Sequence, residues 1–141
     1  MPVRRFRGDV TAARCARRAV REELSDALTK RRLADVELLV SELATNSVRH
    51  AGCAETDEIS IRADVKPDRV RVSMFDPGDG FDVHTPQPPS NGAAGGYGLV
   101  LLERLSDRWG VQRGDGFGVW FEVQRERLPF GDERSPRAQT A

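Results

Sequence analysis

The sequence lacks several features that would place it in a special class of protein. No stretch approaches the roughly 20 consecutive apolar residues that a membrane-spanning helix needs. The N-terminus "MPVRRFRGDV" has no apolar run after its arginines, so it does not read as a secretory signal. The two cysteines, Cys15 and Cys53, stand alone without metal-ligand spacing. Buried or inert thiols in a reducing, cytoplasmic compartment are the simplest interpretation.

The chain also lacks an excess of charge of either sign. Lys+Arg and Asp+Glu are equal at 22 each, so composition predicts no direct nucleic-acid partner and no membrane surface. With 38% hydrophobic and 31% charged residues, the 141 residues suit one globular domain. We expect this domain to span 1–127. The segment 128–141 has no apolar pattern and is expected to be a disordered tail.

Apolar residues at helical spacing predict three helices, over 11–28, from about 32 to 50, and over 99–107. The first helix carries a second, basic stripe, which consists of Arg14, Arg17, Arg18 and Arg21. Such a stripe is either a solvated face or a docking surface for an acidic partner.

Strict alternation predicts strands over 58–65, 69–75, 108–112 and 117–123, paired as two hairpins. A long Gly- and Pro-rich loop separates these hairpins, and a loop of that length is usually functional or disordered. The order helix, helix, hairpin, loop, helix, hairpin predicts an α+β fold. We expect a two-layer α/β sandwich whose mainly antiparallel, mixed sheet is covered on one face by helices.

The second helix contains "ELATNSVRHA", which places Glu42, Asn46 and His50 four residues apart on one side. Glu42 and Asn46 lie at the edge of the apolar stripe, where a cleft wall would place them. An amide oxygen such as that of Asn46 suits Mg²⁺, which prefers oxygen ligands and keeps water. A carboxylate one turn away, Glu42, can activate an attacking hydroxyl or water. His50 and Arg49 either supply positive charge, or His50 pairs with the helix C-terminus.

Two glycine-rich segments complete the candidate site. "DPGDG" begins with Asp76 at the end of a strand, where a buried carboxylate suits an exocyclic amine such as that of adenine. "GGYG" leads into the third helix, so its backbone N–H groups and the helix dipole suit phosphate. The P-loop motif is absent, and "GDGFG" lies between two strands as a hairpin turn.

Together these segments resemble the GHKL ATPase superfamily. "ELATNSVRHA" is similar to its N-box, "DPGDG" to its first glycine box and "GGYGLVLL" to its second. The small size, the arginine-rich first helix and "LLERLSDRWGV…VWFEV" resemble the single-domain bacterial branch that contains the anti-sigma-factor serine kinases.

The resemblance covers about 6–123 and implies roles for individual residues. Glu42 matches the catalytic base, and Asn46 matches the ligand of Mg²⁺ beside ATP. Asp76 matches the acceptor for the adenine amine. The remaining nucleotide-binding positions are Gly78 and Gly80 under the base, and Gly96, Tyr97, Gly98 and Leu99 at the phosphates.

The resemblance also implies partners and leaves three functions open. The partners would be a sigma factor and a small anti-sigma antagonist protein, with a homodimer possible. However, 81–97, the expected lid, contains no Lys or Arg, although cations are a large part of phosphoryl-transfer catalysis. The chain is therefore a serine kinase, an ATP-responsive switch that binds partners with little or no transfer, or an interaction domain whose boxes are turns and caps.

Overall fold

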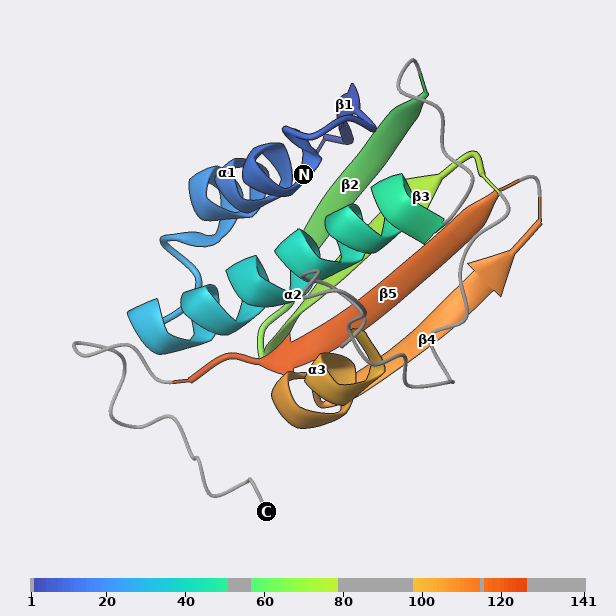
Figure 1. The fold of residues 1–141 in the computed structure, drawn as a ribbon. Helices are drawn as coiled ribbons and strands as arrows, with labels where there is room; N and C mark the ends of the chain where they lie inside the picture. Colours follow the sequence, from blue (N-terminus) through green and yellow to red (C-terminus); the bar gives the residue numbers. More distant parts are fainter. Residues whose placement is uncertain (1, 51–56, 79–97, 115, 127–141) are drawn as a thin grey trace.

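The computed structural model describes residues 2–50, 57–78, 98–114 and 116–126 of the chain (Figure 1). The predicted lid and the predicted tail from 128 onward lie outside these ranges. Within them, no helix has both the length and the apolar character that crossing a membrane requires.

Five strands form one sheet in the order β1-β2-β3-β5-β4. Their bounds are β1 Arg4–Arg7, β2 Glu58–Val65, β3 Arg69–Asp76, β4 Arg108–Arg113 and β5 Phe117–Gln124. Every neighbouring pair is antiparallel. The two predicted hairpins, β2–β3 and β4–β5, are confirmed, and the pairing of β3 with β5 joins them into one sheet. β1, which the sequence analysis did not predict, adds an edge strand beside β2.

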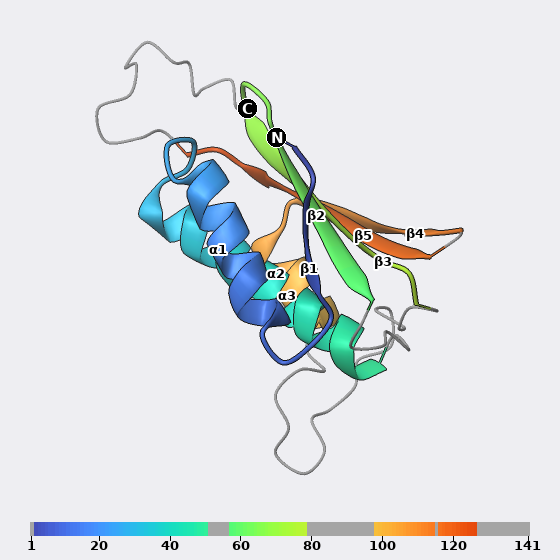
Figure 2. The same cartoon turned by 90° about the horizontal axis from the view of Figure 1, so that it is seen from above.

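The helices α1 (Ala12–Leu24), α2 (Lys30–His50) and α3 (Gly98–Leu105) all lie on one face of this sheet (Figure 2). α2 runs between α1 and α3 and contacts both. The predicted α+β sandwich with helices on one face is therefore confirmed. α2 begins where the Thr29 hydroxyl accepts a hydrogen bond from the backbone N–H of Arg32, since a side-chain oxygen at this position satisfies an otherwise unpaired helix donor.

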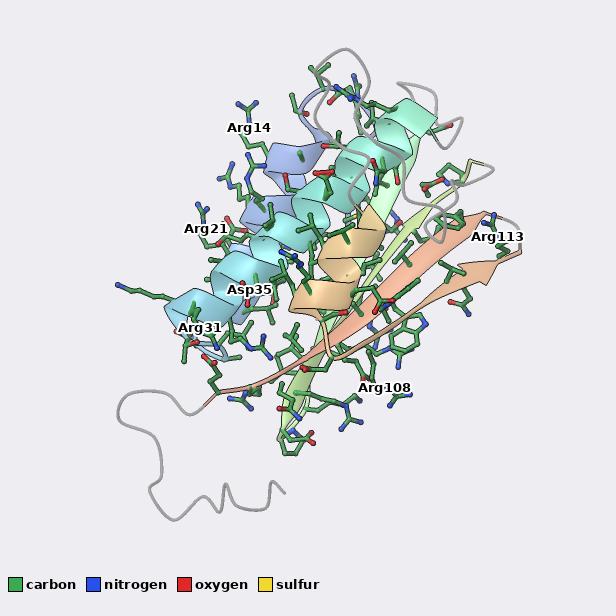
Figure 3. All side chains as sticks on the ribbon, turned by 60° about the horizontal axis from the view of Figure 1, so that its bottom comes forward. Arg14, Arg21, Arg31, Asp35, Arg108 and Arg113 are labelled. Carbon is green, nitrogen blue, oxygen red and sulfur yellow. The ribbon has the colours of Figure 1, made fainter. Side chains whose placement is uncertain are left out.

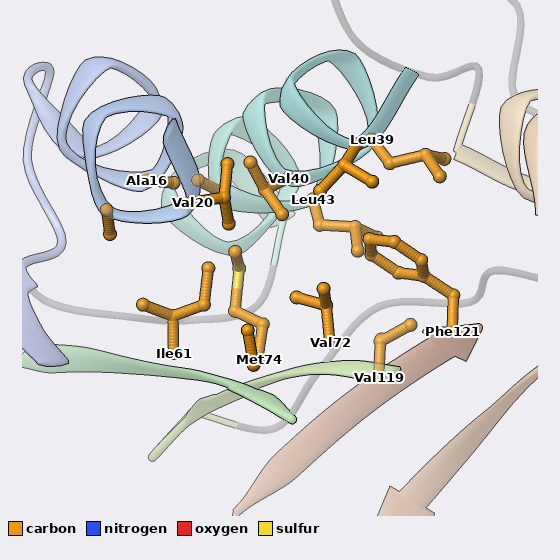
Figure 4. Close-up of a cluster of buried hydrophobic side chains, with 14 of the residues drawn as sticks. Ala16, Val20, Leu39, Val40, Leu43, Ile61, Val72, Met74, Val119 and Phe121 are labelled. Carbon is orange, nitrogen blue, oxygen red and sulfur yellow. The ribbon is translucent and has the colours of Figure 1, made fainter. Parts of the chain in front are cut away.

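Apolar side chains fill the space between the two layers (Figure 4). The strands contribute alternate residues because successive side chains point to opposite faces of a sheet. The core includes Ala16 and Val20 of α1, Leu39 and Leu43 of α2, and Phe121 of β5. The strand predicted over 117–123 is confirmed as β5, and its alternate residues Phe117, Val119, Phe121 and Val123 are all buried. On β2, Ile59, Ile61 and Ala63 point inward and are buried. Val65 belongs to the same face but is 50% exposed, because β2 ends there.

Candidate functional site

Asp76, the last residue of β3, is the centre of the candidate site. It is 2% exposed and lies opposite Phe117 of β5. The hydroxyl of Ser47 in α2 donates a hydrogen bond to its Oδ2 atom at 2.9 Å, and the N–H of Gly78 donates to Oδ1 at 2.8 Å. Because each carboxylate oxygen has two lone pairs, Asp76 can still accept a further donor from a ligand.

The environment of Asp76 acts on its charge in both directions. Burial raises the pKa of the carboxyl because removal from water disfavours the ionised form, and the nearby charge of Asp57 raises it further. The hydrogen bonds from Ser47 and Gly78 oppose this effect because they stabilise the carboxylate. The net effect is a raised pKa. A buried carboxyl with a perturbed pKa and fixed donors is typical of a functional site.

Asn46 and Glu42 occupy successive turns of α2, the helix whose Ser47 bonds this carboxylate. Asn46 is 4% exposed, and its Oδ1 atom has no hydrogen-bond partner among the described residues. Glu42 is partly buried, with its Oε1 atom buried. Since Ser47 directly follows Asn46 and bonds Asp76, the helix residue predicted to hold Mg²⁺ is tied to the end of β3.

The buried amide oxygen of Asn46 fits a magnesium ligand. Leaving a buried acceptor without a partner costs about 1–3 kcal/mol, and a hard cation would satisfy it. In the described part of the chain, no cluster of three or more His, Cys, Asp or Glu side chains could hold a metal ion. One amide oxygen is nevertheless enough when phosphate and water oxygens complete an octahedron around Mg²⁺.

The glycine boxes are only partly described. Gly78 is half-buried and bonds Asp76, as stated above. Gly98 is the first residue of α3, which packs against α2, so the N-terminal end of α3 belongs to the same helical layer as Asn46. Gly80, Gly96 and Tyr97 lie outside the described residues, as do the side chains of Leu99 and His50.

Gly116, in the β4–β5 turn, lies unusually close to the candidate site. A Cβ atom at this position would be 2.5 Å from the backbone oxygen of Asp76 and 2.4 Å from the ring of Phe75. Only glycine permits this approach without movement of the strand end. Gly114 and Gly116 lie between β4 and β5, in agreement with the predicted hairpin, and Gly116 closely approaches the backbone of Asp76.

The sequence analysis therefore missed two residues, Ser47 and Gly116. Ser47 falls four residues after Leu43 and is 3% exposed, on the core-facing stripe of α2. A hydroxyl at a position where the spacing expects an apolar residue was the available signal. Gly116 carried no such signal, since a glycine in a hairpin turn is ordinary.

The basic stripe of α1 is largely engaged within the chain, which favours the solvated-face alternative for three of its four arginines. Arg17 donates to the hydroxyl of Ser41 at 2.7 Å, and Arg21 forms an ion pair with Glu37 at 2.7 Å. Arg18 pairs with a glutamate one turn away. Arg14 points outward from α1 near Arg21 (Figure 3).

A family model described as "Histidine kinase-like ATPase domain" matches residues 6–122. The chain belongs to this family. The similar proteins include "Serine-protein kinase RsbW" of Bacillus licheniformis, which is 37% identical over 69% of each chain. They also include the RsbW of Oceanobacillus iheyensis, 33% identical over 74% of this chain and 75% of its own. The predicted superfamily and its serine-kinase branch are thus confirmed.

A solved structure carries the same fold as this histidine kinase-like ATPase domain. The histidine kinase domain of the Erythrobacter litoralis EL346 blue-light activated histidine kinase matches with a TM-score of 0.51. The match has 22% sequence identity and covers 79% of this chain and 58% of that one. At this identity the likeness concerns the fold only.

Proposed function

We propose that the chain binds ATP with Mg²⁺ and transfers the γ-phosphoryl group to a serine of a small anti-sigma antagonist protein, while acting as an anti-sigma factor on a sigma factor. The observation that carries this proposal is the connection of α2 to the end of β3. There the buried amide of Asn46 and the buried carboxylate of Asp76 are joined through Ser47. The relatives named serine-protein kinase support the type of reaction.

Each predicted site residue has a defined part in this proposal. Asp76 accepts a hydrogen bond from the adenine amine, and Asn46 contributes its amide oxygen to Mg²⁺. The ion, when bound, neutralises charge on the phosphates. Gly78 and Gly80 leave room for the base. The remaining positions proposed to contact the phosphates are Gly96, Tyr97, Gly98 and Leu99.

Glu42 is the proposed catalytic base. It lies one turn before Asn46, so it faces the same region of the site. The serine hydroxyl of the antagonist loses its proton to Glu42 while its oxygen bonds to the γ-phosphorus. The bond between that phosphorus and the β–γ bridging oxygen breaks, and ADP leaves. This step needs no other reactant than ATP and the antagonist.

The absence of Lys and Arg from 81–97 favours a second candidate function. If no other cation reaches the γ-phosphate, transfer is slow. The chain would then be an ATP-responsive switch that binds its partners with little or no phosphorylation. In either case we place the protein in the cytoplasm with its sigma factor, and a homodimer is compatible with both functions.

The proposal is tested by incubating the purified chain with labelled ATP, Mg²⁺ and candidate antagonists. Label should appear on an antagonist serine, and Glu42→Gln should reduce transfer by at least about a hundredfold while ATP still binds. Glu103→Gln is the matched control, since Glu103 is an exposed carboxylate of α3. Undiminished transfer by Glu42→Gln would refute the role of Glu42. ATP-dependent antagonist binding without transfer would favour the switch.

A further inference from the structure

The hydroxyl of Ser47 is buried between α2 and β3. Ser47 is 3% exposed, and its described partner is the Oδ2 atom of Asp76 at 2.9 Å. Its neighbours on the stripe, Leu43 and Ala44, are apolar core residues. An alanine at position 47 would pack on the same stripe without burying a hydroxyl. The hydroxyl therefore gives the carboxylate a hydrogen bond that the apolar packing of this stripe does not require.

Ser47 is the donor that the helical layer supplies to Asp76. Gly78, the other donor, comes from the segment that follows β3 itself. The charge of Asp57 raises the pKa of Asp76. On the β5 side the neighbour is the apolar Phe117, whose ring lies 4.8 Å from the guanidinium of Arg113 in β4. A hydrogen bond from Ser47 to a buried carboxylate is charge-assisted and thus stronger than one between neutral groups.

We infer that Ser47 is a positioning residue that keeps Asp76 ionised and oriented toward the base, and thereby sets a preference for an amino base over a keto base. This inference rests on the proposed function, because it requires that Asp76 meets the base. A carboxylate can only accept hydrogen bonds, so it attracts the amino group of adenine and repels a keto oxygen. A protonated carboxyl, in contrast, can donate a hydrogen bond to a keto oxygen.

Removal of the Ser47 hydroxyl should therefore have two linked effects on nucleotide binding. Ser47→Ala should weaken binding of a non-hydrolysable ATP analogue by about tenfold near the pH at which Asp76 titrates. In the Ser47→Ala variant, the loss of affinity at acid pH should begin at a higher pH than in the wild type, because the lost hydrogen bond stabilised the ionised form of Asp76. The corresponding analogue of inosine triphosphate carries a keto group in place of the amine. Ser47→Ala should lower the affinity for this analogue less than the affinity for the ATP analogue. Calorimetric titration of both analogues with Mg²⁺ at a series of pH values measures these effects.

Ser41→Ala is the matched control. Ser41 is another serine of α2 with a bonded hydroxyl, but its partner is Arg17. It should keep the wild-type pH profile and the wild-type ratio of ATP to inosine triphosphate affinity. Ser47→Cys, close to serine in size but a weak donor, should act in the same direction as Ser47→Ala. If Ser47→Ala does not fold, Ser47→Cys alone tests the role of the hydroxyl.

The outcomes separate this inference from the function on which it rests. If the wild-type chain binds neither analogue at any pH, the proposed function and the inference both fail. If the wild type binds the ATP analogue and Asp76→Asn binds it much more weakly, the nucleotide-binding part of the proposed function stands. In that case an unchanged pH profile and an unchanged base preference in both Ser47 variants would overturn the inference alone.

Discussion

Asp76→Asn should weaken nucleotide binding without weakening the fold, because the substitution changes the charge of a buried side chain but not its shape. The amide oxygen of Asn can accept the hydrogen bond from Gly78, as Oδ1 does now at 2.8 Å. The amide NH₂ can donate to Ser47, whose hydroxyl rotates to accept. Both structural contacts of position 76 are thus preserved, and only the ability to accept an additional donor at full negative charge is lost.

The size of the binding loss follows from the kind of hydrogen bond involved. A hydrogen bond to a charged partner contributes about 1.5–3 kcal/mol. Since 1.4 kcal/mol corresponds to a factor of ten in the dissociation constant, the affinity for ATP should fall by about 10- to 150-fold. The 2% exposure of Asp76 favours the upper part of this range, because water cannot replace the lost interaction.

The stability of the ligand-free chain should change in the opposite direction. Burial raises the pKa of Asp76 above its ordinary value of 3.8. Between the unfolded and the folded pKa the native state binds more protons than the unfolded state, so the stability contributed by this group falls as pH rises through that window. Asn does not titrate. Asp76→Asn should therefore be at least as stable as the wild type at neutral pH, and its advantage should vanish at acid pH.

Thermal unfolding with and without Mg-ATP measures both effects in one experiment. Ligand at 100 times its dissociation constant stabilises a protein by about 2.7 kcal/mol, so the wild-type midpoint should rise on addition of ATP and the variant's should rise much less. Two results would refute the reasoning. One is an ATP-dependent shift as large in Asp76→Asn as in the wild type. The other is a variant that is less stable without ligand at neutral pH.

Four further substitutions probe the site and the core. Gly116→Ala places a Cβ 2.5 Å from the Asp76 backbone oxygen. It should lower both the free energy of unfolding and the affinity for ATP, and calorimetry measures both. Gly114→Ala, with no atom within 4 Å of its Cβ, should lower neither, and equal effects would contradict the close-approach argument. Asn46→Ala should remove the dependence of ATP binding on Mg²⁺ at little cost in urea stability, and an unchanged dependence would exclude Asn46 as ligand. Phe121→Ala should cost about 3–5 kcal/mol of unfolding free energy; a cost below about 1 kcal/mol would contradict its central place in the core.

Much of the fold was predictable because hydrophobic period is a local property. Alternation along β2, β3 and β5 and the stripes of α1 and α2 predicted the elements and their buried faces. β1 was not predictable in this way, since "RRFR" has a single apolar residue, Phe6, and becomes a strand only by pairing with β2. The β3–β5 pairing joins segments far apart in sequence, and no local pattern specifies it.

The candidate site was predictable where its chemistry depends on residue type and position within one element. Asp76 belongs to this group, because it is buried at a strand end as its pattern indicated. Asn46 lies on the predicted helix, but it is more deeply buried than a position at the edge of the apolar stripe predicted. Ser47 depends on a contact between two layers. Its 2.9 Å hydrogen bond to Asp76 arises only once α2 lies across the end of β3.

The two outer strands of the sheet have a consequence for the behaviour of the protein at high concentration. An open strand edge offers unpaired backbone groups to which another chain can add. β1 carries Arg4, Arg5 and Arg7 among its four residues, and β4 begins and ends with exposed arginines. Arg4 and Arg108 are paired with glutamates of the same chain. The exposed side chains of Arg5, Arg7 and Arg113 still place positive charge along both borders, which opposes the edge-on addition of a second copy of the sheet.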